Sequence, residues 1–270
     1  FFIRPRRFGK SIFLSMLRAY YDIAQREKFD KRFGNLWIGS RPTRLQGTFQ
    51  ILFLDFSRAS GGSGTLAENF DRYCCMVMDL FGMSYESYYF PGFAQEMKAQ
   101  PDFVSKLNYL NLHAAETGAH LYLIIDEYDN FTNVVLNEQG KEVYHALTHA
   151  SGFYREIFKK FKGMFERIFM TGVSPVTLDD LTSGFNIGWN ISTKHQFNIM
   201  LGFSETDVRE MLQYYKDARQ LPGNVDISAM IEEMRPWYDN YCFAEESLER
   251  DPKMFNCDMA VSYTHLTLPT

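Results

Sequence analysis

Three mostly apolar runs constrain the fold of this chain more than any other feature. They are FQILFLDF at residues 49–56, LYLIIDEYD at 121–129 and RIFMTGV at 167–173. A strand with one solvated face alternates apolar and polar residues, whereas a strand covered on both faces is apolar along its length. We therefore predict that the three runs form parallel strands of one buried sheet.

Apolar residues recur at helical spacing between these runs, around residues 66–80, 101–117 and 142–162. Strands that alternate with helices are typical of a doubly wound, mostly parallel α/β sheet. The 270 residues suffice for one large domain of this kind with a small appendage. The run FNIMLGF at 197–203 is predicted to be one more strand, and a helical region is predicted to follow it.

The first residues, FFIRPRRFGKS, contain a partial match to the phosphate-loop pattern GxxxxGK(S/T). Gly9, Lys10 and Ser11 fit the pattern, whereas Arg4 occupies the position of its first glycine. The apolar residues before the loop predict the end of a strand, and the periodicity after it predicts a helix over residues 10–27. Strand, loop and helix are the context that the pattern requires.

A helix N-terminus with this sequence can bind phosphate groups. Its unpaired amides and positive dipole attract anions, Lys10 can reach the β- and γ-phosphates of ATP, and Ser11 can offer its hydroxyl to Mg²⁺. The tripeptide GKS also starts helices that bind no nucleotide. The prediction therefore depends on an acidic partner elsewhere in the chain.

Asp126 and Glu127 end the apolar run LYLIIDE and supply that partner. Asp126 is predicted to make the second protein contact to Mg²⁺, and Glu127 to orient or deprotonate an attacking water. Thr171 ends the next run, where we predict a polar residue that senses the γ-phosphate, with Ser174 as the reserve. Acids and threonines at strand ends are also common as solvated or structural residues, and these alternatives stay open.

Composition narrows the function classes. The net charge of −5 and the pI near 5.7 argue against a general binder of nucleic acids or acidic membranes, although Arg4, Arg6, Arg7 and Lys10 predict a local cationic patch. The four cysteines show no CxxC pair, so neither a zinc site nor a disulfide framework is indicated. A reduced, cytoplasmic compartment is expected, and no run reaches the roughly 20 apolar residues of a membrane helix.

Five segments taken in order, RPRRFGKS, LYLIIDEYDNF, IFMTGVSPVTLDDLTSGFNIG, LGFSETDVREML and WYDNYCF, resemble the AAA-ATPase-like family of bacterial proteins. Many of its members carry a restriction-endonuclease-like nuclease domain after the ATPase. The resemblance implies a P-loop NTPase core of the additional-strand type with ATP and Mg²⁺ as cofactors. It also implies that the arginine-rich loop is the usual form. Because Arg4 and Pro5 leave this loop with fewer backbone donors, Arg6 and Arg7 can either substitute for them by direct charge or face solvent, and both alternatives stay open.

The expected domain organisation is an ATPase core at residues 1–203, a helical region at 204–260, and a tail at 261–270. The tail VSYTHLTLPT matches the translation of a sequencing-adapter DNA and is expected to be an artefact. Because the chain also begins without Met, we expect a fragment of a longer protein.

The expected function is ATP binding with hydrolysis that powers or regulates a following effector domain, such as a nuclease. A nucleotide-binding switch or scaffold without turnover is the alternative, and a small-molecule kinase is disfavoured because Glu127 suits attack by water. Homo-oligomers, and nucleic acid reached through the effector domain, stay open as partners, whereas a membrane is not expected.

Overall fold

The computed structural model describes residues 1–59, 64–148, 153–174, 188–238, 241–258 and 260–261. The chain divides into two compact units. We call Ser11–Gly188 the sheet unit, and Phe1–Lys10 together with Trp189–Thr270 the loop unit. Apart from Val261, the tail predicted to be an artefact lies outside the described residues.

Three parallel strands form the centre of the sheet unit among its described residues. They are β2 (Gln50–Asp55), β3 (Leu121–Asp126) and β4 (Arg167–Gly172), with β3 in the middle. Every residue of β3 is buried, as the apolar run predicted. The predicted α/β fold class with a parallel sheet is therefore confirmed, and each strand is slightly shorter than its apolar run.

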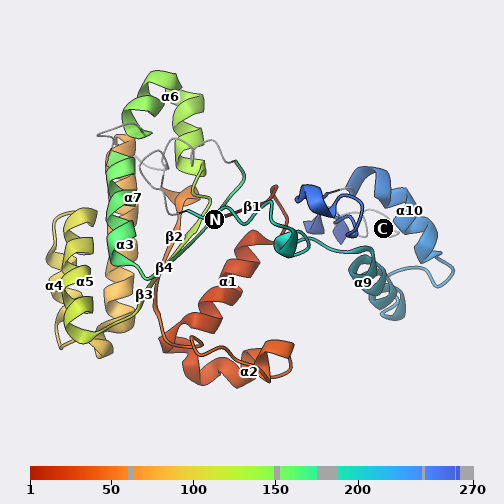
Figure 1. The fold of residues 1–270 in the computed structure, drawn as a ribbon, viewed down its shortest axis with the longest axis horizontal. Helices are drawn as coiled ribbons and strands as arrows, with labels where there is room; N and C mark the ends of the chain where they lie inside the picture. Colours follow the sequence, from red (N-terminus) through yellow and green to blue (C-terminus); the bar gives the residue numbers. More distant parts are fainter. Residues whose placement is uncertain (60–63, 149–152, 175–187, 239–240, 259, 262–270) are drawn as a thin grey trace. The chain divides into compact units, whose positions relative to one another are not determined.

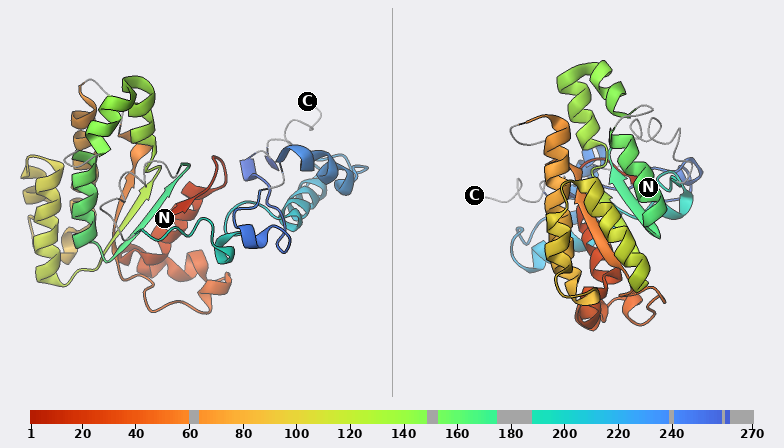
Figure 2. Two further views of the ribbon diagram at one scale, coloured as in Figure 1. Left: turned by 45° about the horizontal axis from the view of Figure 1, so that its top comes forward. Right: turned by 90° about the vertical axis from the view of Figure 1, so that its left-hand side faces the viewer.

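Helices cover both faces of these strands. Figures 1 and 2 show α1 (Lys10–Tyr21) on one face and α3 (Leu66–Tyr85), α5 (Phe103–Thr117) and α7 (Phe153–Met164) on the other. On the α1 side, Leu14 packs in one apolar cluster with residues of β2 and β3. This two-sided cover explains why the strands carry no alternating polar residues.

The remaining helices of the sheet unit are short or bent. They are α2 (Phe29–Phe33), α4 (Phe93–Ala99) and α6 (Asn130–Thr148). The unit also contains 3-10 turns at Ile23–Lys28, Trp37–Gly39, Phe56–Arg58 and Glu86–Tyr88. The range 142–162, predicted as one helix, holds the end of α6 and most of α7, and residues 149–152 between them lie outside the described residues. Gly140, inside α6, has φ +82 and marks a kink.

The loop unit contains β1 (Phe2–Ile3), α9 (Glu205–Asp217), α10 (Ile227–Tyr238) and 3-10 turns at His195–Phe197 and Glu245–Ser247. Its core joins Val208 and Leu212 of α9 to Ile231 and Met234 of α10. Ser204 and Asp207 form a capping box at the start of α9. The two helices thus pack through one apolar face each, as amphipathic helices do.

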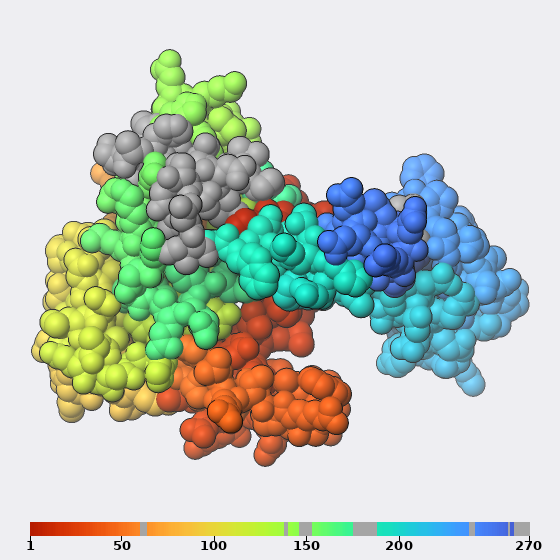
Figure 3. All heavy atoms as spheres, in the orientation of Figure 1, coloured from red at the N-terminus to blue at the C-terminus, as the bar shows by residue number. Residues whose placement is uncertain are grey.

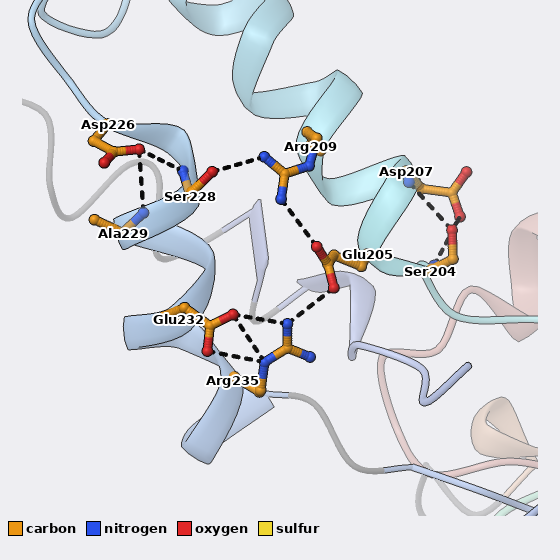
Figure 4. Close-up of polar contacts among 9 residues, drawn as sticks. All are labelled: Ser204, Glu205, Asp207, Arg209, Asp226, Ser228, Ala229, Glu232 and Arg235. Atoms are coloured by element: carbon orange, nitrogen blue, oxygen red, sulfur yellow. Dashed lines mark hydrogen bonds and ion pairs between the residues drawn. The ribbon is translucent and has the colours of Figure 1, made fainter. Parts of the chain in front are cut away.

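A polar clamp also joins α9 to α10 (Figure 4). The Glu205 carboxylate accepts from Arg209 of its own helix and from Arg235 of α10, each at 2.9 Å. Arg209 further donates to Ser228 Oγ at 3.0 Å, and Arg235 pairs with Glu232. The clamp links the two helices through side chains that are partly exposed to solvent.

The strand predicted at residues 197–203 is wrong. Among its residues only Phe203 forms a β-bridge, an isolated one with Phe255. Gly202 has φ +106, which interrupts an extended chain, and the buried Asn198 side chain accepts from the amides of Phe243 and Ala244. This segment is therefore apolar because it lies inside the loop unit, and not because it is a strand.

Within the described ranges, no helix is long and apolar enough to cross a membrane.

Candidate functional site

Asp126, the last residue of β3, gathers two hydroxyl groups in the sheet unit. Ser11 Oγ donates to its Oδ2 at 2.6 Å, and Thr171 Oγ1 of β4 donates to its Oδ1, also at 2.6 Å. The parallel register places Ile125 beside Met170, so the next residues on each strand are neighbours. Asp126 is 4% exposed and Thr171 is fully buried. The structure thus brings three predicted site residues together.

Ser11 Oγ and Asp126 Oδ2 form a pair of oxygen atoms that fits Mg²⁺. Magnesium binds oxygen ligands at about 2.1 Å in an octahedron, which puts neighbouring ligands about 3 Å apart. Ser11 Oγ and Asp126 Oδ2, at 2.6 Å, need to separate only slightly to become two such ligands. The described residues contain no cluster of three His, Cys, Asp or Glu side chains that could hold a metal by themselves. A site of one carboxylate and one hydroxyl suits Mg²⁺ that is also held by phosphate and water.

Glu127 follows Asp126 in an unusual backbone conformation. Its φ is +49, in the left-handed region that costs a non-glycine residue energy. The Glu127 amide donates to Asp126 Oδ1 at 3.0 Å, and Asn130 Nδ2 donates to the Glu127 carboxylate at 3.1 Å. Such outliers often occur at functional sites, where surrounding contacts hold them. The extended backbone of β3 therefore ends at Asp126, and Glu127 begins a turn.

Asp129, Tyr128 and Gly172 hold the ends of β3 and β4 together, a role that the sequence reasoning did not predict. Asp129 accepts from the amides of Val173 at 3.1 Å and Ser174 at 2.6 Å. The Tyr128 hydroxyl donates to the Ser174 carbonyl at 2.5 Å. A Cβ on Gly172 would lie 2.5 Å from the Tyr128 ring. The residues that make these contacts lie in the sequences DEYD and TGVS. Their contacts could be predicted only once β3 and β4 were known to be adjacent.

Gly9 and Lys10 lie in the loop unit, on the turn that leads directly into Ser11. Gly9 has φ +83 and Arg7 has φ +69, so the backbone doubles back before α1 begins. Lys10 is 7% exposed, and its Nζ donates to the carbonyls of Arg4 and Pro5 at 3.0 Å each. The loop therefore wraps around the ammonium group of its own lysine.

The predicted cationic patch is wrong in part, because Arg4 and Lys10 are buried. The Arg4 guanidinium lies over the rings of Phe2 and Phe243, at 4.1 and 3.9 Å, and donates to the carbonyls of Ser192 and Phe197. Burial lowers the pKa of Arg4 to about 10. Arg4 is a structural residue in the place of the first glycine. Of the predicted patch, Arg6 and Arg7 are exposed.

An aromatic cradle, made of Tyr241 and Phe243, holds the loop through Phe8. The buried Phe8 ring meets these rings edge to face at 4.8 and 5.5 Å. Asn256 Nδ2 donates to the Arg6 carbonyl at 3.1 Å. The segment WYDNYCF, which carried part of the sequence resemblance, thus supports the loop from a distant part of the chain.

Arg7 is paired in this structure. Its guanidinium donates to Asp258 at 2.9 Å, and both side chains are about half exposed or more, at 68% and 49%. Exposed pairs of this kind contribute about 1 kcal/mol or less. A phosphate with a greater charge can therefore compete with Asp258 for Arg7.

Comparison with known proteins agrees with the motifs. Residues 1–182 match a family model described as "Predicted AAA-ATPase". The chain belongs to the AAA-ATPase-like family. An Azotobacter chroococcum mcd 1 protein, named "Uncharacterized protein in vnfD 5'region", is 24% identical over 250 residues, which cover 92% of this chain. That alignment covers 42% of the relative, so this AAA-ATPase-like chain spans less than half of the relative's length.

A solved structure of the Aeropyrum pernix ORC2 protein, in ADPNP–ADP complexes, is similar at a TM-score of 0.40 and 10% identity. The match covers 98% of the AAA-ATPase-like chain and 60% of the ORC2 chain. Agreement at this level does not establish a shared activity.

Proposed function

We propose that this AAA-ATPase-like chain binds ATP with Mg²⁺. The observation that carries the proposal is the 2.6 Å contact between Ser11, which follows Gly9 and Lys10 at the start of α1, and Asp126 at the end of β3. In this proposal Lys10, Arg6 and Arg7 neutralise the phosphates, and Ser11 and Asp126 hold the metal. Bound Mg²⁺ supplies charge neutralisation on the β- and γ-phosphates.

The chain's own residues also suggest how hydrolysis would proceed. Glu127 is the candidate that accepts a proton from the attacking water, because it directly follows the proposed metal-binding acid at the end of β3. Thr171 is proposed to orient Asp126 through their hydrogen bond and to respond to the γ-phosphate through it. A following effector domain, homo-oligomers and a cytoplasmic location belong to this proposal.

Binding is tested with a fluorescent ATP analogue and purified protein. Lys10→Ala is expected to abolish binding, because the ammonium group is the only strong cation within the GKS turn. Lys160→Ala, at an exposed position on α7, is the matched control and should bind as the parent does. Unchanged affinity in a folded Lys10→Ala protein would remove the proposed site.

Turnover is tested by phosphate release, with and without DNA. Glu127→Gln is expected to keep nucleotide affinity and lose release, since the amide cannot accept the proton. Glu142→Gln, at an exposed position on α6, serves as the control. Release at the parent rate by Glu127→Gln would exclude Glu127 as the base. A parent protein that binds but never releases phosphate would favour the switch or scaffold alternative.

A further inference from the structure

Charge is distributed unevenly along the chain. Residues 26–44 hold six Lys or Arg and two Asp or Glu, a net charge of +4 in a chain whose total is −5, which leaves −9 on the remainder. We call residues 26–44 the basic–aromatic segment. It lies in the sheet unit between α1 and β2, away from the phosphate loop in sequence. A local excess of cations on an acidic protein marks a surface for an anionic partner.

The basic–aromatic segment is a built structure and not a loose insertion. Its inner side chains, Phe29 and Phe33 of α2, stack at 5.5 Å and pack against Tyr20 at the end of α1. The Tyr20 hydroxyl accepts from the Thr43 amide at 2.7 Å, which ties the far end of the segment to the same helix. The outward side chains are therefore presented from a supported backbone. Figure 3 shows the segment, in orange, at the bottom of the view.

All six basic side chains face solvent, and among the residues that the structure describes none of the six forms an ion pair. They are Arg26, Lys28, Lys31, Arg32, Arg41 and Arg44. Some other cations of the sheet unit form ion pairs, as Arg58 does with Asp55 and Lys159 with Glu156. The segment thus offers positive charge that its own fold does not use.

Exposed aromatic surface accompanies these charges. Trp37 is 71% exposed and Leu36 is 48% exposed. The Arg41 guanidinium lies over the Trp37 ring, 5.5 Å from its centroid. A tryptophan left in solvent beside unpaired arginines is a flat π surface next to phosphate-binding groups. Bases stack on such rings for about 1–3 kcal/mol each, and arginine adds a cation–π contribution.

We propose that the basic–aromatic segment binds single-stranded nucleic acid. Its arginines and lysines contact phosphates, and Trp37 with Arg41 forms the platform on which a base stacks. An acidic membrane is the less favoured occupant, because surface helices that bind lipid present a continuous apolar face over several turns. Here α2 has five residues and the turn that carries Trp37 has three.

The test uses the full chain without nucleotide, so that its failure is separate from failure of the proposed ATP site. Fluorescence anisotropy follows a labelled oligothymidylate of about 20 nucleotides, enough for several binding sites of the usual size. We expect binding that weakens with salt, with a log–log slope of about −0.7 for each phosphate contact. Trp37→Ala should weaken binding at least about fivefold, the low end for loss of one stacked base.

Matched variants separate a site from general charge. Arg41→Glu with Arg44→Glu should weaken binding and reduce the salt slope, whereas Lys160→Glu with Lys162→Glu, on exposed positions of α7, changes the total charge equally and should have little effect. Trp237→Ala, at a 74% exposed tryptophan of α10, is the control for Trp37→Ala. All six substituted side chains are exposed, so the variants should fold, which circular dichroism checks.

Three results would overturn the proposal. The first is an oligonucleotide that does not bind. The second is equal weakening by the α7 pair and by the Arg41 and Arg44 pair, which would mean unspecific attraction. The third is binding to phosphatidylserine vesicles that needs Trp37, together with no effect of Trp37→Ala on the oligonucleotide, which would make the surface a membrane contact.

Discussion

Gly172 is the residue at which the end of β4 leaves no room for a side chain. An added Cβ would lie 2.5 Å from a Tyr128 ring carbon and 2.6 Å from Asp129 Oδ1. Both neighbours are held in place, since the Tyr128 hydroxyl bonds Ser174 and Asp129 accepts two amides. The close approach of the two strand ends therefore depends on a hydrogen atom at this position.

Gly172→Ala is expected to destabilise the protein by about 1–3 kcal/mol, the usual range for overpacking of a rigid core. Gly163→Ala is the matched control, because a Cβ there meets nothing within 4 Å and the residue lies in α7. That control should be neutral or stabilise by up to about 1 kcal/mol. Denaturant unfolding measures both, and equal midpoints would contradict the packing argument.

Thr171 is proposed to act through Asp126 and not on the ligand directly. Thr171→Val keeps the shape and removes the 2.6 Å hydrogen bond to Asp126. The Mg²⁺ concentration needed for half-maximal ATP binding should then rise about tenfold or more, as when an outer hydrogen bond to a metal ligand is lost. Thr171→Ser retains a hydroxyl and should restore most of the affinity. A titration curve identical for all three proteins would assign Thr171 a purely structural role.

At the scale of elements, the phosphate loop depends on the aromatic cradle at residues 241–243. Tyr241→Ala removes the ring that Phe8 meets at 4.8 Å and should weaken binding of the ATP analogue, because the loop loses its support. Tyr241→Phe keeps the ring and should bind normally. Tyr214→Ala, at a 70% exposed tyrosine of α9, is the control. If Tyr241→Ala bound the ATP analogue as tightly as Tyr214→Ala does, the loop would hold its shape without the cradle.

The clamp between α9 and α10 predicts a pH dependence. Hydrogen bonds from Arg235, and next from Arg209, lower the pKa of Glu205 below its ordinary 4.5. A carboxylate with a lowered pKa stabilises the folded state above its unfolded pKa, and the contribution is lost as the pH falls through the folded value. Glu205→Gln should therefore unfold at a lower temperature than the parent near pH 7. Because the groups are exposed, the loss of unfolding free energy should be less than about 1 kcal/mol.

The difference between parent and Glu205→Gln should shrink as the pH falls below 4.5. Glu249→Gln, at an exposed position outside the clamp, provides the comparison. Thermal unfolding across this pH range measures both. A difference that stays constant with pH would exclude the ionised clamp as its source.

Elements were predictable where one local pattern had one physical cause. Continuous apolar runs located β2, β3 and β4 because strands buried on both faces need them, and the acid at the end of β3 followed from the same run. The run at 197–203 failed, because apolar residues that pack as turns give the same pattern as a strand. The burial of Arg4 and the cradle around Phe8 depend on residues about 190 to 240 positions away, which no local pattern reveals.

At the scale of the whole molecule, net charge is an average that conceals its distribution. The total of −5 argues against nucleic acid as a general partner, yet residues 26–44 alone carry +4. Electrostatic attraction at about 0.15 M salt acts over roughly 8 Å, so a ligand senses the nearby surface and not the total. The sequence estimate of partners was therefore limited because it looked for a local excess of cations only in the phosphate loop and not at residues 26–44.

Ligand binding should also stabilise the whole chain against heat. A ligand at a hundred times its Kd stabilises the folded state by about 2.7 kcal/mol, which for a chain of this size raises Tm by roughly 5–10 °C. We expect this shift with ATP and Mg²⁺, and most of it should disappear when EDTA removes the metal.

Asp126→Asn preserves size and removes the charge that faces Ser11. The rise in Tm that ATP causes in the Asp126→Asn protein should therefore equal the rise seen for the parent in EDTA, whether or not Mg²⁺ is present. Asp217→Asn, on α9, should behave as the parent. If Asp126→Asn retained the full Mg²⁺-dependent shift, the metal would have to be held elsewhere.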